Sequence, residues 1–193
     1  GNGIPSNVNL VSISCKAIDT AVTAGNIGTT SYVYRTVNGG LNWTQVFSQA
    51  NGKINAVWMR NALLGFMAGD PVGGRWSLWK TTNGGANWDS ANVRLQQAGS
   101  ESGFNNSLSI IYNHIWFGTN NSRLYHSTNN GMSWSSVTVP DVNSSALWIY
   151  WDTTVYTFVR FGGSNVFQTT NGGTNWTQSM CPDTGQFRGF CPG

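Results

Sequence analysis

The chain has 193 residues, of which 39% are hydrophobic and only 9% are charged, against roughly 25% charged residues in an average globular domain. The ten Lys and Arg residues behind its formal net charge of +3 form no cluster or stripe, which argues against a nucleic-acid-binding protein, and no apolar run approaches the roughly 18 residues of a membrane span. Asn, Ser, Thr and Gly replace the missing charges, as in secreted β-proteins, wall proteins and lectins, so we expect a secreted or cell-surface protein.

Short runs rich in β-branched and aromatic residues follow one another along the chain, each bounded by Gly, Asn or Asp, and no 3.6-residue helical period interrupts them. The sequence therefore predicts an all-β protein. The runs form four groups of four: 11–18, 22–26, 31–35 and 43–47; 54–59, 65–70, 77–80 and 88–93; 108–112, 115–120, 123–126 and 134–139; 146–151, 155–161, 165–168 and 176–180.

One eight-residue segment separates the third and fourth runs of every group. It reads TVNGGLNW at 36–43, TTNGGANW at 81–88, STNNGMSW at 127–134 and TTNGGTNW at 169–176. Asn-Gly tolerates positive φ, so the segment predicts a tight hairpin that its hydroxyl and Asn side chains brace and its Trp covers. The residues with this structural role are Thr36, Asn38, Gly40, Trp43, Thr81, Asn83, Gly85, Trp88, Ser127, Asn129, Gly131, Trp134, Thr169, Asn171, Gly173 and Trp176.

This segment resembles the Asp-box, or BNR-like repeat, of sialidase-type and related β-propellers, with Asn in place of Asp at positions 38, 83, 129 and 171. The wider repeat, an apolar strand with Ala-Gly or Phe-Gly and then VYRTVNGGLNW, looks like the propellers of photosystem II assembly factors and of sortilin-like secreted bacterial proteins. The resemblance covers nearly the whole chain. It implies that the box is a fold signature on the outer hairpin of each blade, away from the central ligand face.

The repeat and the resemblance together predict one β-propeller domain at 1–182, with four four-stranded antiparallel blades at 1–49, 50–97, 98–140 and 141–182. Propellers of these families usually have more than four blades. Three alternatives follow: a closed four-bladed ring, part of a larger ring, or a protomer that completes a ring or stack with its neighbours. We expect the leading GNGIPSNVN and the tail 183–193 to cover the terminal faces by adding a strand or by pairing with another subunit.

Three cysteines and several sequons allow covalent modification. Cys181 and Cys191 flank the tail and are candidates for a disulfide, whereas Cys15 is expected to be a buried thiol or the partner of a tail cysteine. No Cys or His spacing indicates a metal site, and we expect no cofactor. The loop sequons at Asn105, Asn120 and Asn143 are candidate glycosylation sites if the host glycosylates the protein.

The titratable residues argue against an enzyme. A sialidase needs an arginine triad, a Tyr–Glu pair and an acidic proton donor, and glycosidases generally need two facing carboxylates. Glu101 is the only glutamate, and Asp70 is its least improbable partner, because the other aspartates sit at turns. His114 lies at a turn, and His126 takes a strand slot that holds other polar residues in the sister groups, so we expect it to face solvent. We assign no catalytic residue; a fragment of a sialidase-like hydrolase is the least favoured alternative.

Two binding functions remain. One is a scaffold that binds protein partners or copies of itself, and the other is a lectin that stacks sugars on Trp side chains. Trp58 and Trp148 lie on corresponding inner strands and are expected in the core. Lectin propellers repeat their sugar-contacting residues in every blade, whereas the extra Trp residues of this chain do not recur at one slot, which favours the scaffold. The candidate exposed ligand contacts are Arg75, Trp76, Trp151 and Arg160.

Overall fold

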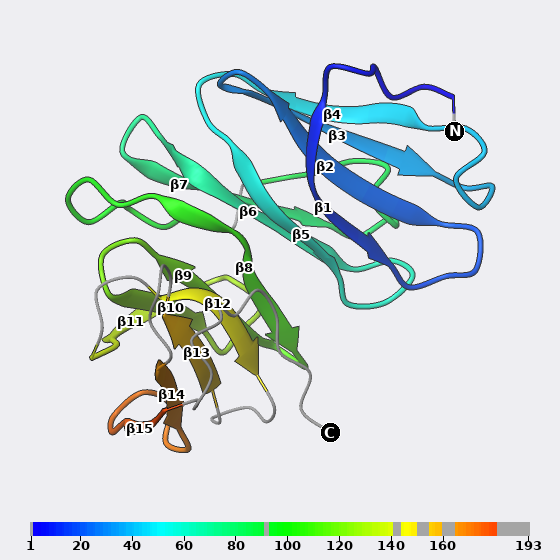
Figure 1. Ribbon diagram of the computed structural model, residues 1–193. Coiled ribbons are helices and arrows are strands. Elements are labelled where there is room, and N and C mark those ends of the chain that lie inside the picture. Colours follow the sequence, from blue (N-terminus) through cyan, green and yellow to red (C-terminus); the bar gives the residue numbers. More distant parts are fainter. Residues whose placement is uncertain (1, 91–92, 141–143, 150–154, 160–164, 181–193) are drawn as a thin grey trace. The chain divides into compact units, whose positions relative to one another are not determined.

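The structure is a computed structural model that describes residues 2–90, 93–140, 144–149, 155–159 and 165–180 (Figure 1). These residues contain fifteen β-strands, all paired antiparallel, and no helix among them is long and apolar enough to cross a membrane. The chain divides into two compact units, Gly1–Ser100 and Glu101–Gly193. Five residues singled out from the sequence lie outside the described part: Asn143, Trp151, Arg160, Cys181 and Cys191.

The first unit contains two sheets. Sheet 1 has the strand order β1 (Asn9–Cys15), β2 (Ala21–Ile27), β3 (Thr30–Thr36) and β4 (Thr44–Gln49). Sheet 2 has the order β5 (Ile54–Met59), β6 (Gly65–Val72) and β7 (Arg75–Thr81). Strands β1 and β2 of sheet 1 pack against β5 of sheet 2 (Figure 1). The core between the two sheets consists of Val22, Ala24, Val33, Ile54, Val57, Met59 and Met67.

Sheet 2 has three strands, which corrects the predicted fourth strand at 88–93. Asp89 pairs with Lys80 and Gln96 pairs with Arg75, but these are two isolated bridges. Among the described residues between them, Val93 is buried beside β7, and the Leu95 carbonyl accepts from the Trp76 backbone N–H at 3.0 Å. The reason is local: the polar sequence that follows Trp88 has a low strand propensity and too few apolar residues to alternate along the edge.

The second unit also contains two sheets. Sheet 3 has the order β8 (Gly103–Ile111), β9 (His114–Thr119), β10 (Arg123–Ser127) and β11 (Ser135–Thr138). Sheet 4 has the order β12 (Ser144–Ile149), β13 (Val155–Val159), β14 (Asn165–Thr169) and β15 (Thr177–Met180). Strand β12 packs against β8 and β9, and the buried cluster of this unit is Trp116, Leu124, Val139 and Phe167. The all-β class and the four antiparallel sheets are therefore confirmed.

The same hydrogen-bonded loop follows the third strand of each sheet. In sheet 1, Thr36 Oγ1 donates to Asn38 Oδ1 at 2.9 Å and accepts from the Gly40 N–H at 3.0 Å, while Asn38 Oδ1 also accepts from the Asn42 N–H at 2.9 Å. The same three bonds recur in the loops of the other sheets. Gly40 has a φ of +87°, which a residue without Cβ adopts at low cost.

Candidate functional site

A groove of about 370 Å³ lies beside β7, where the fourth strand of sheet 2 is interrupted. Strand β7 contributes Arg75, Trp76, Ser77 and Trp79 to its wall, and the end of β4 contributes Gln49. The segment that returns past β7 contributes Ser90 and Val93–Leu95. The groove therefore belongs entirely to the first unit and lies between β7 and the segment that returns past it.

A chain of hydrogen bonds fixes one wall of the groove. Trp79 Nε1 donates to Gln49 Oε1 at 3.0 Å, and Gln49 Nε2 donates to Ser77 Oγ at 2.7 Å. The Ser77 hydroxyl then donates to the Asp70 backbone carbonyl at 2.6 Å. The Trp79 ring also packs edge-on against Phe47, with 4.7 Å between the ring centroids. The Gln49 amide is thus held at both ends, and the wall is preorganised before any ligand arrives.

The charged residues that line the groove are both positive. Arg75 and Arg94 line it and are both exposed, and no acidic side chain is among its lining residues. Asp70 lies behind the wall, where Asn55 Nδ2 donates to its carboxylate at 2.8 Å. Guanidinium groups bind carboxylates through paired hydrogen bonds, so the groove suits a ligand that carries a carboxylate.

Two of the predicted ligand contacts, Arg75 and Trp76, come together in this groove. Arg75 is exposed as expected, but Trp76 is only 4% exposed, which corrects the expectation of an exposed ring. The backbone N–H of Trp76 donates to the Leu95 carbonyl at 3.0 Å, so the returning segment runs alongside β7 at this residue. Gln49 and Arg94 were missed, because they are distant from β7 in sequence and no local pattern marks them.

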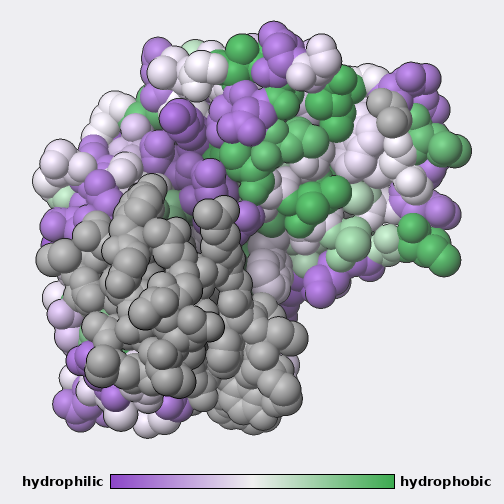
Figure 2. Space-filling view, viewed as in Figure 1, coloured by the Kyte–Doolittle hydropathy of each residue, from purple (hydrophilic) through white to green (hydrophobic). Residues whose placement is uncertain are grey.

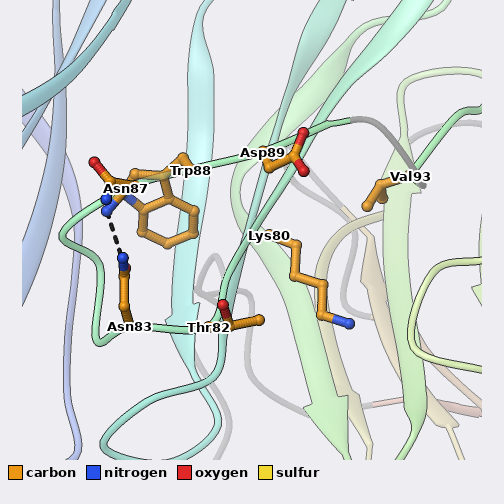
Figure 3. Close-up of a pocket in the computed structure, with 7 residues that line it drawn as sticks. All are labelled: Lys80, Thr82, Asn83, Asn87, Trp88, Asp89 and Val93. Carbon is orange, nitrogen blue, oxygen red and sulfur yellow. Dashed lines mark hydrogen bonds between the residues drawn. The ribbon is translucent and has the colours of Figure 1, made fainter.

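A second pocket, of about 260 Å³, lies at the box loop of sheet 2 (Figure 3). The backbones of Lys80 and Asp89 are paired there by two hydrogen bonds of 2.9 Å. The Asn83 side chain accepts from the Asn87 N–H, a bond of the loop itself. Val93 lines both pockets. Since the polar groups of this smaller pocket already serve the loop, we take the groove beside β7 as the candidate site.

Glu101 is a structural residue in this fold. Its side chain is fully buried, Tyr125 Oη donates to its carboxylate at 2.8 Å, and Arg123 Nη1 lies 2.9 Å from its other oxygen. A carboxylate in this position has no access to a substrate. Of the two carboxylates weighed as the least improbable acid pair, Glu101 is therefore not accessible.

His126 is buried rather than facing solvent, which corrects the sequence expectation. Only 8% of it is exposed, because its ring stacks on Trp116, its cross-strand neighbour, with 3.7 Å between ring centroids. His114 Nδ1 lies 3.0 Å from His126 Nε2. Burial, and next the neighbouring His114, lower the pKa of His126 from 6.5 to about 4, so it is neutral at pH 7.

The remaining candidate residues fall at separate places. Cys15 is an exposed free thiol on β1, which corrects the expectation of a buried or paired cysteine, because the face of sheet 1 that carries it is open at this strand. Asn105 is exposed but lies within β8, which corrects its expected place in a loop. Asn120 is exposed, and Trp58 is half-buried. Within the described residues, no group of three or more His, Cys, Asp or Glu side chains is placed to hold a metal ion.

No family model matches the chain, and no curated protein matches it either. Several solved structures do. The structure of YCF48 bound to D1 peptide is 16% identical with a TM-score of 0.62, and covers 91% of this chain and 56% of that one. YCF48 from Cyanidioschyzon merolae is also 16% identical with a TM-score of 0.62, and covers 95% and 60%.

The GH74 enzyme of Niastella koreensis is 18% identical with a TM-score of 0.61, and covers 88% of this chain and 30% of that one. The chain thus spans 56–60% of the YCF48 chains and less than a third of this GH74 enzyme. At such identities the likeness concerns the fold alone. The protein is therefore an all-β chain of four antiparallel sheets with a β-propeller-like fold.

Proposed function

We propose that the chain is a non-enzymatic, extracellular β-propeller module that binds protein partners through the groove beside β7. The four sheets act as four blades, and the box loops are Asp-box-like structural hairpins. The observation that carries the proposal is the groove itself: a hydrogen-bonded wall with two exposed arginines and no acidic lining residue. The low fraction of charged residues and the Asn- and Ser-rich composition support an extracellular location.

A peptide segment fits the chemistry of this groove. An extended peptide offers backbone amides and carbonyls to polar groups such as Ser90, and its acidic side chains or carboxyl terminus suit Arg75 and Arg94. YCF48, which has the same fold, has been solved with a peptide bound. We infer that the ligand of this chain is an acidic peptide segment of a partner protein.

The surroundings of the carboxylates support a role without catalysis. Glu101 is sealed within the second unit, and the Asp70 carboxylate accepts a hydrogen bond from Asn55 behind the groove wall. Glycoside hydrolysis needs two carboxylates on either side of a substrate, and the groove lining has none.

Carbohydrate binding is the second candidate function. Trp76 and Trp79 line the groove together with amide, hydroxyl and guanidinium groups, which is also a set that binds sugars. The positive charge of the groove favours an acidic peptide over a sugar, because two exposed arginines add little binding energy for an uncharged ligand.

The test uses the purified full chain against a random peptide library and a glycan array. We expect enrichment of peptides with Asp, Glu or a free carboxyl terminus, and no glycan signal. The double variant Arg75→Ala/Arg94→Ala should weaken peptide binding at least about tenfold, since each charge-assisted hydrogen bond contributes roughly 1.5–3 kcal/mol. Lys16→Ala, which removes an exposed charge outside the groove lining, is the matched control. A glycan signal lost in the double variant would instead establish the lectin.

A further inference from the structure

Strand β1 presents an exposed apolar strip. Leu10 is 49% exposed and Ile13 is 66% exposed, and Cys15, two positions further on, is an exposed free thiol. Figure 2 shows hydrophobic residues gathered over this strand. We call these three residues the β1 face. No charged residue occurs anywhere in β1, so the strip is not the solvated side of an ordinary edge strand.

The three residues of the β1 face have counterparts in sheet 2, which occupy the same register positions and lie in the core of the first unit. The first strand of sheet 2 pairs with its neighbour as β1 does, and both pairings shift at the same place, after Leu10 in β1 and after Ile54 in β5. The first residues of the box loops fix the alignment of the two sheets. Thr36 pairs with Ala21 at the start of β2, and Thr81 pairs with Gly65 at the start of β6. The corresponding pairs are Leu10 with Ile54, Ile13 with Val57, and Cys15 with Met59.

In sheet 2 these positions form an interface between sheets. Ile54, Val57 and Met59 are at most 3% exposed, because they pack against Val22, Ala24 and Val33 of sheet 1. The second unit repeats the arrangement: Trp116 and Leu124 of sheet 3, at the register positions of Val22 and Val33, pack with Phe167 of sheet 4. In each unit one sheet thus presents its second and third strands to the next sheet. Among the described residues of its own unit, sheet 1 has no such neighbour on its β1 face.

The N-terminal segment covers only part of this side of sheet 1. Asn2 forms a parallel bridge with Asn42, and the Trp43 N–H donates to the Asn2 carbonyl at 2.8 Å. The Val8 side chain lies against Gly25, so closely that a Cβ atom on Gly25 would come within 2.5 Å of it. Tyr34, on the same side as Ile13, is 2% exposed. The leading segment therefore pairs beside sheet 1 through a single bridge and leaves the β1 face open, and the tail 183–193 lies outside the described residues.

We propose that the β1 face binds sheet 4 of a second copy of this chain, head to tail. Tyr156, Phe158 and Val166 occupy in β13 and β14 the register positions that Val22, Ala24 and Val33 occupy in β2 and β3, and all three are apolar. The contact continues the sheet-to-sheet interface that each unit already contains. Two copies that exchange it reciprocally bury both faces in a closed ring.

The inference extends the proposed interaction role to a second surface, and the two are tested separately. Native mass is measured by light scattering for the full chain, for Ile13→Asp and for Ile18→Asp. Ile18 is 97% exposed in the turn after β1 and carries the same change outside the β1 face. We expect the wild type and Ile18→Asp to contain two copies or a larger head-to-tail assembly, and Ile13→Asp to fall to the 20.9 kDa of one chain.

Cys15 reports on the same face without any substitution in the core. Maleimide labelling, mapped to Cys15 by mass spectrometry, should be slow in the assembled wild type, faster on dilution, and fast in Ile13→Asp. If Ile13→Asp does not fold, Leu10→Asp and the dilution series replace it. Groove variants should leave the native mass unchanged, and Ile13→Asp should leave peptide binding unchanged.

Isotope-mixed crosslinking identifies the occupant. Phe158→Cys chains labelled with ¹⁵N are mixed with unlabelled chains, and Cys15 is joined to residue 158 with a bis-maleimide. A link between a labelled and an unlabelled chain is the expected result. Links confined to one chain would mean that its own sheet 4 covers the β1 face, and would overturn the proposal. So would a wild-type monomer with reactive Cys15, or an assembly that persists in Ile13→Asp.

Discussion

If Glu101 is a structural residue, removing the single hydroxyl group that donates to its carboxylate should lower the stability of the protein. Replacing Tyr125 by Phe removes the hydroxyl that donates to the Glu101 carboxylate at 2.8 Å and keeps the ring that stacks on Phe117. Glu101 is fully buried on its side chain, so water cannot replace the lost donor, and Arg123 Nη1 at 2.9 Å remains beside the other oxygen. A hydrogen bond to a charged group contributes about 1.5–3 kcal/mol, and we expect Tyr125→Phe to lower the free energy of unfolding by that amount.

The assay is urea unfolding followed by Trp fluorescence and by circular dichroism. Tyr112→Phe is the matched control: Tyr112 is 61% exposed, and we expect a change below about 0.5 kcal/mol. If Tyr125→Phe were as stable as the wild type, Glu101 would not depend on this donor, and its carboxylate would have to be reached by solvent. A role for Glu101 in contact with a substrate would then be open again.

Three further outcomes are expected. Asn38→Ala removes the acceptor of two hydrogen bonds of 2.9 Å in the first box loop, and it should lower the free energy of thermal unfolding by about 1–2 kcal/mol. Asn42→Ala keeps the backbone N–H that donates to Asn38 and should change stability little. Equal effects of the two variants would show that the Asn38 side chain does not stabilise the loop. Gly85→Ala should lower the free energy of unfolding by about 2 kcal/mol or more, since φ is +83° and the new Cβ would come within 2.6 Å of Val22. Gly73→Ala, at φ +60° with open space around it, should lower it by about 1 kcal/mol. The reverse order would contradict the packing at Gly85. Because folding lowers the pKa of His126 to about 4, the unfolded chain protonates this residue at a higher pH than the folded chain does. The urea midpoint should therefore decline from pH 6.5 towards pH 4, and His126→Gln should reduce that decline. The same pH profile in wild type and variant would refute this role of His126.

Much of the fold was predictable because its signals are local. Asn-Gly turn chemistry, the hydroxyl ahead of it and the alternating strand residues recur in all four repeats, and the structure contains the corresponding loops and sheets. The errors concern tertiary neighbours. The backbone of Trp76 bonds to a segment about twenty residues later in sequence, and the ring of His126 stacks on Trp116. Neither contact is visible in the local sequence pattern.

The interrupted fourth strand shows the same limit at the site. The repeat predicted a strand at 88–93, but of the described residues there only Asp89 pairs with β7, at Lys80, and the polar sequence that follows lacks the alternating side chains of a strand. Arg75 and Trp76 were predicted as ligand contacts because their insertion has no counterpart in the other repeats. That these residues share a groove with Gln49 and Arg94 depends on the path of the returning segment.

Hydrogen–deuterium exchange with a peptide selected from the library tests the central claim most directly, namely that the chain binds partners beside β7. The account predicts that bound peptide slows exchange of the amides of β7 and of residues 93–97, and leaves the box loops and β1 unchanged. Slowed exchange at another surface, with the groove unaffected, would contradict the account.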